Sequence, residues 1–250
     1  MRKLHTAVRS KSRLSREQQD QIIKQLEAHA HSDYCIELHP SKYHSATFLV
    51  AHNVFRPDVM TSSRELSRFL CERTHLYHGK RILDMGCGTG VQGIMMGLNG
   101  AKSLCFSDVS HHAVSNTRAN LYLMEASPGP QNRACFRSAT VVQGDLFENI
   151  HGKFDFIVFN HPFFPDDPIE EIPISRSMLD EGGLIRRFFK EAKDYLIFNG
   201  IIIMPFFHFA GGTNNPASHA AENGFEIIEE QRIDAYRGLQ QGDISIFVIR

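Results

Sequence analysis

Short apolar runs alternate with amphipathic segments from residue 81 onward, and this alternation most constrains how the chain can fold. Runs such as RILDM, SLCFSD, FDFIVF and GIIIMPFF are apolar almost throughout, not only at every second position. Such runs are typical of strands that are buried on both faces by intervening helices. We therefore expect an α/β protein with a doubly wound, mostly parallel sheet of seven strands, the last two forming an antiparallel edge hairpin.

The residues before this alternation follow another pattern. A helix is expected from Ser15 to Ala30, with Ser15 as N-cap, Gln18 completing a capping box, and an apolar stripe of Ile22, Ile23 and Leu26. Two strands, Tyr34–Leu38 and Ser45–Ala51, flank the turn HPSKYH, and TSSRELSRFL predicts a helix that begins at a Ser/Thr cap. This organisation predicts a small N-terminal cap in residues 1–78 and a sheet domain in residues 79–250.

Charge and composition narrow the classes of function. The segment MRKLHTAVRSKSRLSREQ is basic but has no interleaved aromatic residues, so we interpret it as a solvated tail and not as an RNA-binding arm. A net charge of −1 provides no general attraction to nucleic acid or anionic membranes. No apolar run approaches the ~20 residues of a membrane span, and no signal peptide is recognisable. Five scattered cysteines without a C-x-x-C pair favour a reducing, cytoplasmic setting.

A glycine loop follows the first strand of the predicted sheet. Its sequence is Asp84-Met-Gly-Cys-Gly-Thr-Gly90, in which alternate glycines allow a tight turn and close approach of a ligand. A dinucleotide fingerprint would need glycine at Val91, and no Gly-Lys-Ser/Thr follows, which excludes a P-loop. Asp84 disfavours a bound pyrophosphate, so the loop, if it is more than a turn, favours a ligand with a cationic group.

Two further acids end the next two strands. Asp108 is placed either to accept hydrogen bonds from ribose hydroxyls or to cap the following helix, and both roles can hold together. Asp145 ends the third strand in GDLF, where its position predicts that it lies near an adenine ring. Leu146 and Phe147 would then provide apolar cover.

The order of LDMGCGTG, FSDVS, GDLF and NHPF resembles that of class I S-adenosylmethionine-dependent methyltransferases, from about Phe48 onward. Within that class the chain is similar to the group with an Asn-Pro-Pro-Tyr/Phe motif, which includes the release-factor glutamine methyltransferases and the methyltransferase small family. The resemblance implies S-adenosylmethionine as cofactor and a set of residues that would bind it: Asp84, Gly86, Cys87, Gly88, Gly90, Asp108, Val109, Asp145, Leu146 and Asn160.

The segment FNHPFFP carries the acceptor motif that this resemblance implies. The resemblance implies that the Asn160 side-chain oxygen and the His161 main-chain oxygen accept hydrogen bonds from both N–H groups of the nitrogen to be methylated. These bonds would free the lone pair of that nitrogen. Phe163 would stack on the planar acceptor group, and Pro162 would stiffen the turn. These four residues are the expected catalytic set, and they predict N-methylation of an amide or amine, either a protein glutamine or a small metabolite.

His161 departs from the family pattern, which has proline at this position. A histidine in place of proline still has the backbone carbonyl, but its imidazole could also act as general base near neutral pH. The alternative hypothesis is therefore O- or N-methylation of a small molecule with His161 as base. A third hypothesis is a non-catalytic, cofactor-binding scaffold for an RNA-processing partner, against which the intact acceptor motif argues.

The remaining features give weaker predictions. An acidic loop, PDDPIEEIPI, is expected to be solvated and to disfavour nucleic acid as a substrate. His208 is a candidate for the acceptor pocket, together with the phenylalanines beside it. His111-His112 and His29-Ala-His31 lack the spacing of metal ligands, so they are interpreted as surface residues, and no metal is expected. The sequence does not indicate an oligomeric state.

Overall fold

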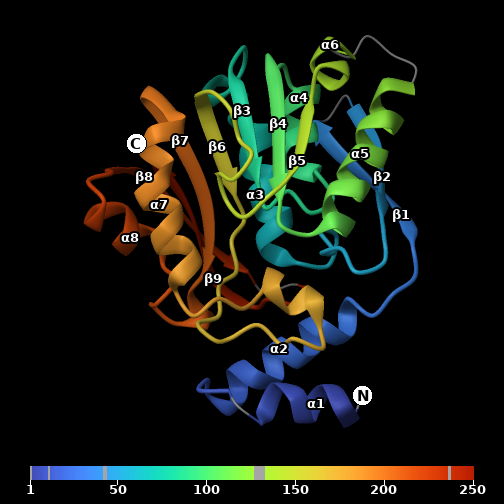
Figure 1. Ribbon diagram of the computed structural model, residues 1–250, viewed down its shortest axis with the longest axis vertical. Coiled ribbons are helices and arrows are strands. Elements are labelled where there is room, and N and C mark those ends of the chain that lie inside the picture. Colours follow the sequence, from blue (N-terminus) through green and yellow to red (C-terminus); the bar gives the residue numbers. More distant parts are fainter. Residues whose placement is uncertain (1, 11, 42–43, 127–132, 236–237) are drawn as a thin grey trace.

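A computed structural model describes residues 2–10, 12–41, 44–126, 133–235 and 238–250, and every structural statement below concerns these residues (Figure 1). The expected loop SPGPQN and the centre of the expected turn HPSKYH lie outside them. The main sheet has seven strands in the order β5-β4-β3-β6-β7-β9-β8. Their bounds are β3 (Arg81–Met85), β4 (Ser103–Asp108), β5 (Thr140–Gln143), β6 (Phe154–Phe159), β7 (Leu196–Phe207), β8 (Ile227–Ala235) and β9 (Gly242–Ile249).

The pairing of these strands confirms the predicted fold class. Strands β3 to β7 pair in parallel, whereas β9 pairs antiparallel with both β7 and β8. The two last strands thus form the edge hairpin that their short connection predicts. The helices of this part are α4 (Val91–Leu98), α5 (His111–Ala126), α6 (Arg133–Arg137), α7 (Gly183–Tyr195) and α8 (Pro216–Glu222), with short 3-10 helices η1 (Thr74–Leu76), η2 (Pro173–Ser177) and η3 (His208–Ala210).

Each face of the sheet has its own apolar core, which explains the near-continuous apolar strands. Along β6, Phe156 and Val158 pack on one face, whereas Ile157 and Phe159 pack on the other. This alternation follows from the two-residue repeat of a strand. The first face is covered by helices α3 (Thr61–Glu72), α4 and α5, and the second by α7 and α8. The N-terminal helix α2 (Arg16–Ala28) contributes apolar residues to the second core.

The N-terminal elements largely follow the sequence predictions. Ser15 caps α2 with the predicted capping box to Gln18, and the three apolar residues of the stripe are buried. Strands β1 (Tyr34–Ser41) and β2 (His44–Val50) form a separate antiparallel pair. The cap of α3 is a correction: Met60 is the N-cap without a side-chain bond, and Gln240 instead accepts a hydrogen bond from the Ser62 main-chain N–H.

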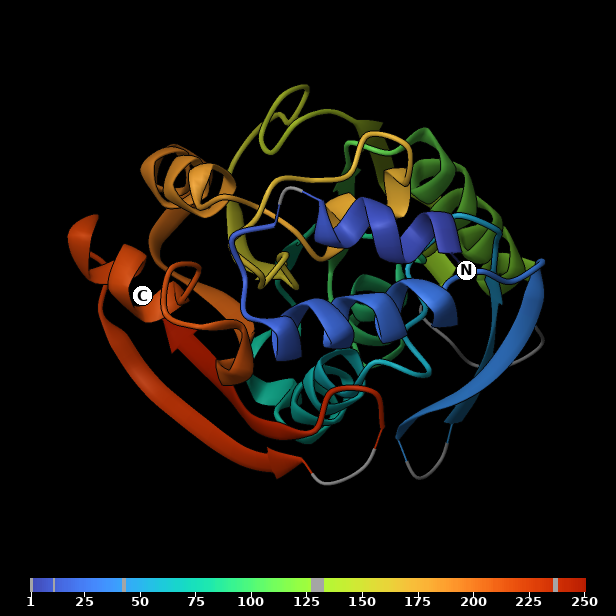
Figure 2. The ribbon, with the colours of Figure 1, turned by 90° about the horizontal axis from the view of Figure 1, so that it is seen from below.

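The basic N-terminus is also a correction, because it is not a frayed tail. Residues Arg2–Arg9 form helix α1, whose Val8 is buried against α2. Helices α1 and α2 lie beyond the ends of the strands in Figure 1 and across the molecule when it is viewed from below in Figure 2. None of the helices in the described part of the chain has the length and apolar character that crossing a bilayer requires.

Candidate functional site

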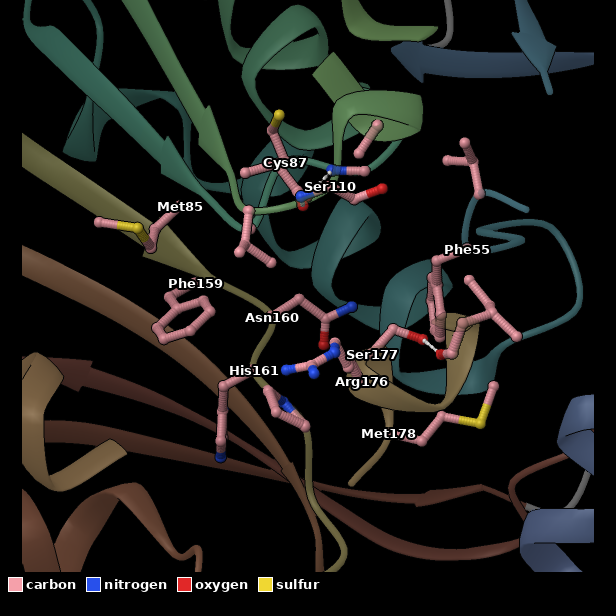
Figure 3. A pocket seen from close by; sticks show the side chains of 18 of the residues that line it. Phe55, Met85, Cys87, Ser110, Phe159, Asn160, His161, Arg176, Ser177 and Met178 are labelled. Atoms are coloured by element: carbon pink, nitrogen blue, oxygen red, sulfur yellow. Dashed lines mark hydrogen bonds between the residues drawn. The ribbon is translucent and has the colours of Figure 1, made fainter. Parts of the chain in front are cut away.

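A cavity of about 410 Å³ opens where β3, β4 and β6 end (Figure 3). Its walls include the glycine loop after β3, the residues around Asp108, the motif after β6 and part of η2. This is the position at which doubly wound sheets bind ligands, because the loops after parallel strands meet there. The volume is in the usual range for a small-molecule site, roughly 300–1,000 Å³.

The glycine loop needs its glycines for two different reasons. Gly86 and Gly88 line the cavity with φ of 61° and 55°, and a Cβ at Gly88 would meet no atom within 4 Å. The space beside Gly88 is therefore open to a ligand. Gly90 was expected to bind cofactor, but it does not line the cavity; it caps α4, and a Cβ there would lie 2.9 Å from Thr117. Its role is helix packing.

Asp84 is a buried acid that faces the cavity with one oxygen to spare. Its Oδ2 accepts a hydrogen bond from the Gly93 main-chain N–H at 2.8 Å, and no described residue donates to Oδ1. Burial, and then the negative charge of Asp108, raise the pKa of Asp84 to about 8. A bound cation would restore the ionised form. The ammonium group of S-adenosylmethionine therefore fits this position.

Asp108 and Val109 form the wall beside the glycine loop. The carboxylate of Asp108 accepts one main-chain hydrogen bond at each oxygen, from Gly88 and from Ser110, both at 2.9 Å. It thus ties the loop to Ser110, the residue directly before α5. The predicted role of Asp108 as N-cap of this helix is wrong, because Ser110 occupies that position. Each oxygen keeps a second lone pair for ribose hydroxyls. Burial raises the pKa of Asp108 despite these hydrogen bonds.

Asp145 lines the cavity with Leu146, but its charge is already paired. Both of its carboxylate oxygens accept hydrogen bonds from the Arg187 guanidinium of α7, at 2.9 and 3.1 Å. Leu146 is buried, as expected for apolar cover, with a positive φ of 51°. Phe147, the other residue expected to cover the ligand, instead stacks on Tyr195 and Phe188 in the core.

Asn160 is held by a residue from the N-terminal region. Its Nδ2 donates a hydrogen bond of 2.9 Å to the Ser63 hydroxyl on α3. No described residue donates to its Oδ1, and the side chain lines the cavity (Figure 3). The amide is therefore oriented so that its oxygen can accept from a bound molecule. Cys87, another predicted cofactor residue, also lines this cavity.

His161 is turned away from the Asn160 amide in Figure 3. Its ring is buried, and its Nε2 lies 2.9 Å from the main-chain oxygen of Asn214. Since a carbonyl only accepts, Nε2 carries the proton. Burial lowers the pKa of His161 to about 4, although the hydrogen bond to Asn214 opposes this shift. The imidazole is therefore a neutral, structurally engaged side chain, which favours a role for its main-chain carbonyl alone.

The other two motif residues, Pro162 and Phe163, line the same cavity. Phe163 is buried and packs edge-on against His161 and Phe206, with ring centroids 5.1 and 5.9 Å apart. His208 is not part of the cavity: its Nε2 lies 2.7 Å from the Ser245 hydroxyl, so its expected place in the acceptor pocket is wrong. His111 and His112 are exposed as expected, yet they border the cavity.

Several lining residues were not found by sequence reasoning. Two of them lie in or directly after η2, and the others precede the sheet in the sequence, so no local pattern connects them to the motif. These residues are Gln25, Val54, Phe55, Pro57, Ser63, Arg176 and Met178.

Comparison with known proteins agrees with this geometry. The family profile of the methyltransferase small domain matches residues 45–214. A protein of Methanocaldococcus jannaschii, provisionally named a protein N5-glutamine methyltransferase, is 33% identical over 128 residues, which are 49% of this chain and 59% of that protein. The ribosomal RNA small subunit methyltransferase C of Chromohalobacter salexigens is 32% identical over 98 residues, which are 39% of this chain and 26% of that protein.

A solved structure shows the same fold. It is the 16S rRNA N2 G1207 methyltransferase of T. thermophilus in complex with AdoMet and guanosine, with a TM-score of 0.59 and 16% identity. The similarity covers 87% of this chain and 50% of that one. The chain thus spans at most about three fifths of the length of the proteins named here.

Proposed function

The chain belongs to the methyltransferase small domain family of S-adenosylmethionine-dependent methyltransferases, and we propose that it methylates the nitrogen of an amide or amine held by Asn160. The predicted family is thereby confirmed, and the acceptor is the part that we propose. The observation that carries it is the Asn160 amide, fixed through Nδ2 by Ser63 and with Oδ1 toward the cavity. The Methanocaldococcus jannaschii relative, whose name gives the N5 of glutamine as the methylated atom, supports a nitrogen acceptor.

The chain's own residues would divide the work between two ends of the cavity. Asp84 would bind the ammonium of S-adenosylmethionine, Gly86 and Gly88 would let the cofactor lie against the backbone, and Asp108 would hold its ribose. Cys87, Val109, Asp145 and Leu146 would complete this end. When bound, the cofactor supplies a methyl group on a positively charged sulfur, which a nitrogen lone pair can attack.

At the other end, the motif after β6 would prepare the acceptor. The Oδ1 of Asn160 and the main-chain oxygen of His161 would accept the two N–H hydrogens of an amide or amine. Accepting both hydrogens draws the nitrogen toward a tetrahedral shape, so that its lone pair is less delocalised and can point at the methyl group. Phe163 would support the planar group, and Pro162 would keep the turn rigid. Most of the rate would come from positioning.

The alternative with His161 as general base has less support. A base must present its unprotonated nitrogen to the acceptor. In His161 this is Nδ1, because Nε2 donates to the Asn214 carbonyl; Nδ1 is buried without a hydrogen-bond partner, and the ring is turned away from Asn160 in Figure 3. Its lowered pKa, about 4, also makes it a weak base. A hydroxyl acceptor, which would need such a base, is therefore disfavoured.

Transfer of labelled methyl groups tests the proposal. The purified chain is incubated with S-adenosylmethionine carrying an isotopically labelled methyl and with an extract of the source cells, and the labelled atom is located by mass spectrometry. We expect the label on nitrogen and its loss in Asn160→Ala, with cofactor binding kept. Label on oxygen or carbon, or full transfer by Asn160→Ala, would overturn the proposed function.

A further inference from the structure

Helix α2 places one polar side chain against the cavity. Gln25 is 1% exposed, lines the cavity, and belongs to none of the elements that form the cofactor end. Its buried Nε2 donates to no acceptor within the described residues. Burying an amide nitrogen without an acceptor destabilises the fold. Most other buried, unpartnered side-chain atoms of the described residues belong to residues that do not line the cavity, whereas Gln25 lines it, so a ligand there can supply the missing acceptor.

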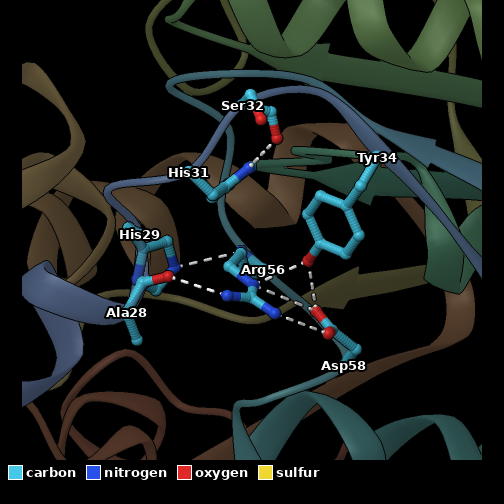
Figure 4. Close-up of polar contacts among 7 residues, drawn as sticks. All are labelled: Ala28, His29, His31, Ser32, Tyr34, Arg56 and Asp58. Atoms are coloured by element: carbon cyan, nitrogen blue, oxygen red, sulfur yellow. Dashed lines mark hydrogen bonds and ion pairs between the residues drawn. The ribbon is translucent and has the colours of Figure 1, made fainter.

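A hydrogen-bonded network fixes the C-terminal end of α2 (Figure 4). His29 Nδ1 lies 2.6 Å from the main-chain oxygen of Gln25, and its Nε2 lies 3.0 Å from the main-chain nitrogen of Arg56. Since that nitrogen is a donor, Nε2 accepts and Nδ1 carries the proton. His29 was expected at the surface, which is wrong, because its ring is buried under this network. Burial lowers the pKa of His29 to about 4, which keeps the ring neutral in this arrangement. The backbone of Gln25 is thereby held in place.

Charged groups extend this network to the chain before α3. The Arg56 guanidinium donates to the main-chain oxygen of Ala28 and pairs with Asp58, both at 2.9 Å. Asp58 also accepts from the Tyr34 hydroxyl at 2.6 Å. At the start of α2, Gln18 donates to the main-chain oxygen of Phe209 at 3.0 Å. Because both ends of α2 are anchored, the helix is a fixed cover of the cavity.

Arg176 is the only lysine or arginine among the described residues that line the cavity. It follows Ser175 in η2, and Figure 3 shows its guanidinium directed toward Asn160. Unlike Arg187, which is paired with Asp145, Arg176 forms no ion pair or hydrogen bond with a described residue. A guanidinium in this position matches the geometry of a carboxylate or phosphate.

A neighbouring groove limits what kind of anion can reach Arg176. This groove of about 1170 Å³ is lined by α1, α2 and the acidic loop, and it meets the cavity at Asn53 and Ile174. Four acids of the loop line it, and none of them forms an ion pair with a described residue: Asp166, Asp167, Glu170 and Glu171. These four acids outnumber Lys3, the lysine that also lines the groove, so they repel a polyanion such as RNA but affect a molecule with a single anionic group far less.

We propose that Arg176 and Gln25 form, with Asn160, an acceptor site for a small molecule that carries one carboxylate or phosphate group. This inference rests on the proposed function and names its substrate class. Arg176 binds the anionic group, Gln25 donates to a carbonyl or hydroxyl of the same molecule, and the nitrogen to be methylated lies at Asn160. A small molecule is favoured over a side chain of a folded protein because the cavity has a volume of only about 410 Å³ and α2 lies over one side of it, although Arg176 itself is exposed.

Binding of defined probes tests the site without requiring turnover. The full chain is saturated with S-adenosylhomocysteine and titrated by calorimetry with para-aminobenzoate, para-aminophenyl phosphate and the neutral para-aminobenzamide. We expect at least one anionic probe to bind more tightly than the neutral one. Arg176→Gln should weaken that anionic probe about 10- to 100-fold, the usual effect of losing a charged hydrogen bond, and leave the neutral probe unchanged. The preferred probe distinguishes carboxylate from phosphate.

Two further variants control this test. Arg186→Gln removes an exposed arginine of α7 outside the cavity and should bind all probes like the wild type. Gln25→Leu should weaken probe binding and, because it removes an unpaired buried donor, should not lower the stability of the free protein. Equal binding of the anionic probe to wild type and Arg176→Gln overturns the proposal. So does an Arg176→Gln variant that loses affinity for S-adenosylhomocysteine, because Arg176 would then serve the cofactor.

A partition of labelled product separates this inference from the proposed function. An extract of the source cells is divided by ultrafiltration into small molecules and macromolecules, and each part is incubated with the chain and labelled S-adenosylmethionine. We expect nitrogen-bound label in the small-molecule part, and its loss in Arg176→Gln. Label in protein would overturn the small-molecule site but leave the proposed N-methylation standing. No label in either part, with cofactor bound, contradicts both.

Discussion

The side-chain nitrogen of Asn160 donates to the hydroxyl of Ser63 at 2.9 Å, across 97 residues of sequence. Ser63 is buried in the first turn of α3, whereas Asn160 follows β6, so the N-terminal region directly orients the acceptor motif. Without this bond, the amide could rotate and present its nitrogen to the acceptor. The contact thus makes the helix before the sheet part of the proposed catalytic arrangement.

Replacing either partner of this contact should affect turnover and not cofactor binding. Asn160→Ala removes an acceptor used in the transition state and should lower kcat by on the order of 10²-fold or more. Ser63→Ala only frees the amide to rotate, so we expect a smaller decrease, and Ser63→Thr, which keeps a hydroxyl, should recover part of it. Steady-state kinetics and calorimetry measure both effects. Wild-type turnover in Asn160→Ala would reduce the motif to a structural turn.

The glycine loop should tolerate no side chain at Gly86. Its φ is 61°, which a β-branched residue avoids, and a Cβ would lie 3.1 Å from the Phe159 ring. Gly86→Val should therefore abolish binding of S-adenosylmethionine measured by calorimetry. The wild type should gain thermal stability from S-adenosylmethionine and none from NAD. A Gly86→Val protein that is folded and binds the cofactor normally would contradict this prediction.

The sequence predicted what depends on local pattern. Apolar runs specified the buried strands, Ser15 and Gln18 the capping box of α2, and the short last connection the edge hairpin. It failed where a structure depends on distant residues. Met60 became the N-cap of α3 because Gln240, from the region between β8 and β9, supplies the missing acceptor. Helix α1 was not predicted because its composition is mainly basic and polar, and only the folded chain shows that Val8 is buried.

The residues of the candidate site also fall into those that the sequence predicted and those that it did not. Residues that follow strands, such as Asp84 and Asn160, were found because every strand of a parallel sheet ends at one edge. Gln25 and Arg176 lie in segments with no recognisable motif, and only the folded chain brings them to the cavity. The pairing of Asp145 with Arg187 also joins two distant segments. The sequence therefore predicted the position of Asp145 but not its ion pair.

Cofactor binding should release a proton through Asp84. Burial and the charge of Asp108 raise its pKa from 3.8 to about 8, so the free protein holds Asp84 mainly protonated at pH 7. A bound ammonium lowers this pKa, and the proton leaves. The heat of binding at pH 7 should therefore depend on the ionisation enthalpy of the buffer. In Asp84→Asn, this dependence should disappear and the affinity should fall.

The same raised pKa has a consequence for the stability of the free protein. A carboxyl whose pKa is raised on folding contributes stability that is complete below its unfolded value of 3.8 and is lost as pH rises through about 8. Asp84→Asn should remove this loss, so that the variant is more stable than the wild type near pH 8. Urea denaturation without cofactor measures it. Parallel stability curves for the two proteins would refute the raised pKa.

His161 provides the last prediction, because its side chain and its main chain are proposed to have different roles. Its buried ring donates to the Asn214 carbonyl, and its pKa is lowered from 6.5 to about 4. A histidine with a lowered pKa contributes stability above pH 6.5 that is lost as pH falls toward 4. His161→Gln, whose amide nitrogen can reach the same carbonyl, should fold and bind cofactor. His161→Pro, which resembles the family motif, leaves that carbonyl without its donor and should lose about 1–3 kcal/mol of stability.

Both variants should keep substantial activity if His161 contributes only its main-chain oxygen. The pH–rate profile of the wild type should then have no limb near ~6.5, the value of an unperturbed histidine. In a general-base mechanism, the same substitutions would cost roughly 10²–10⁴-fold in rate. Kinetics of His161→Gln between pH 5 and 9, on protein shown by calorimetry to bind S-adenosylmethionine, distinguishes the two. An inactive but folded and cofactor-bound variant would make the imidazole the base and redirect the search toward hydroxyl acceptors.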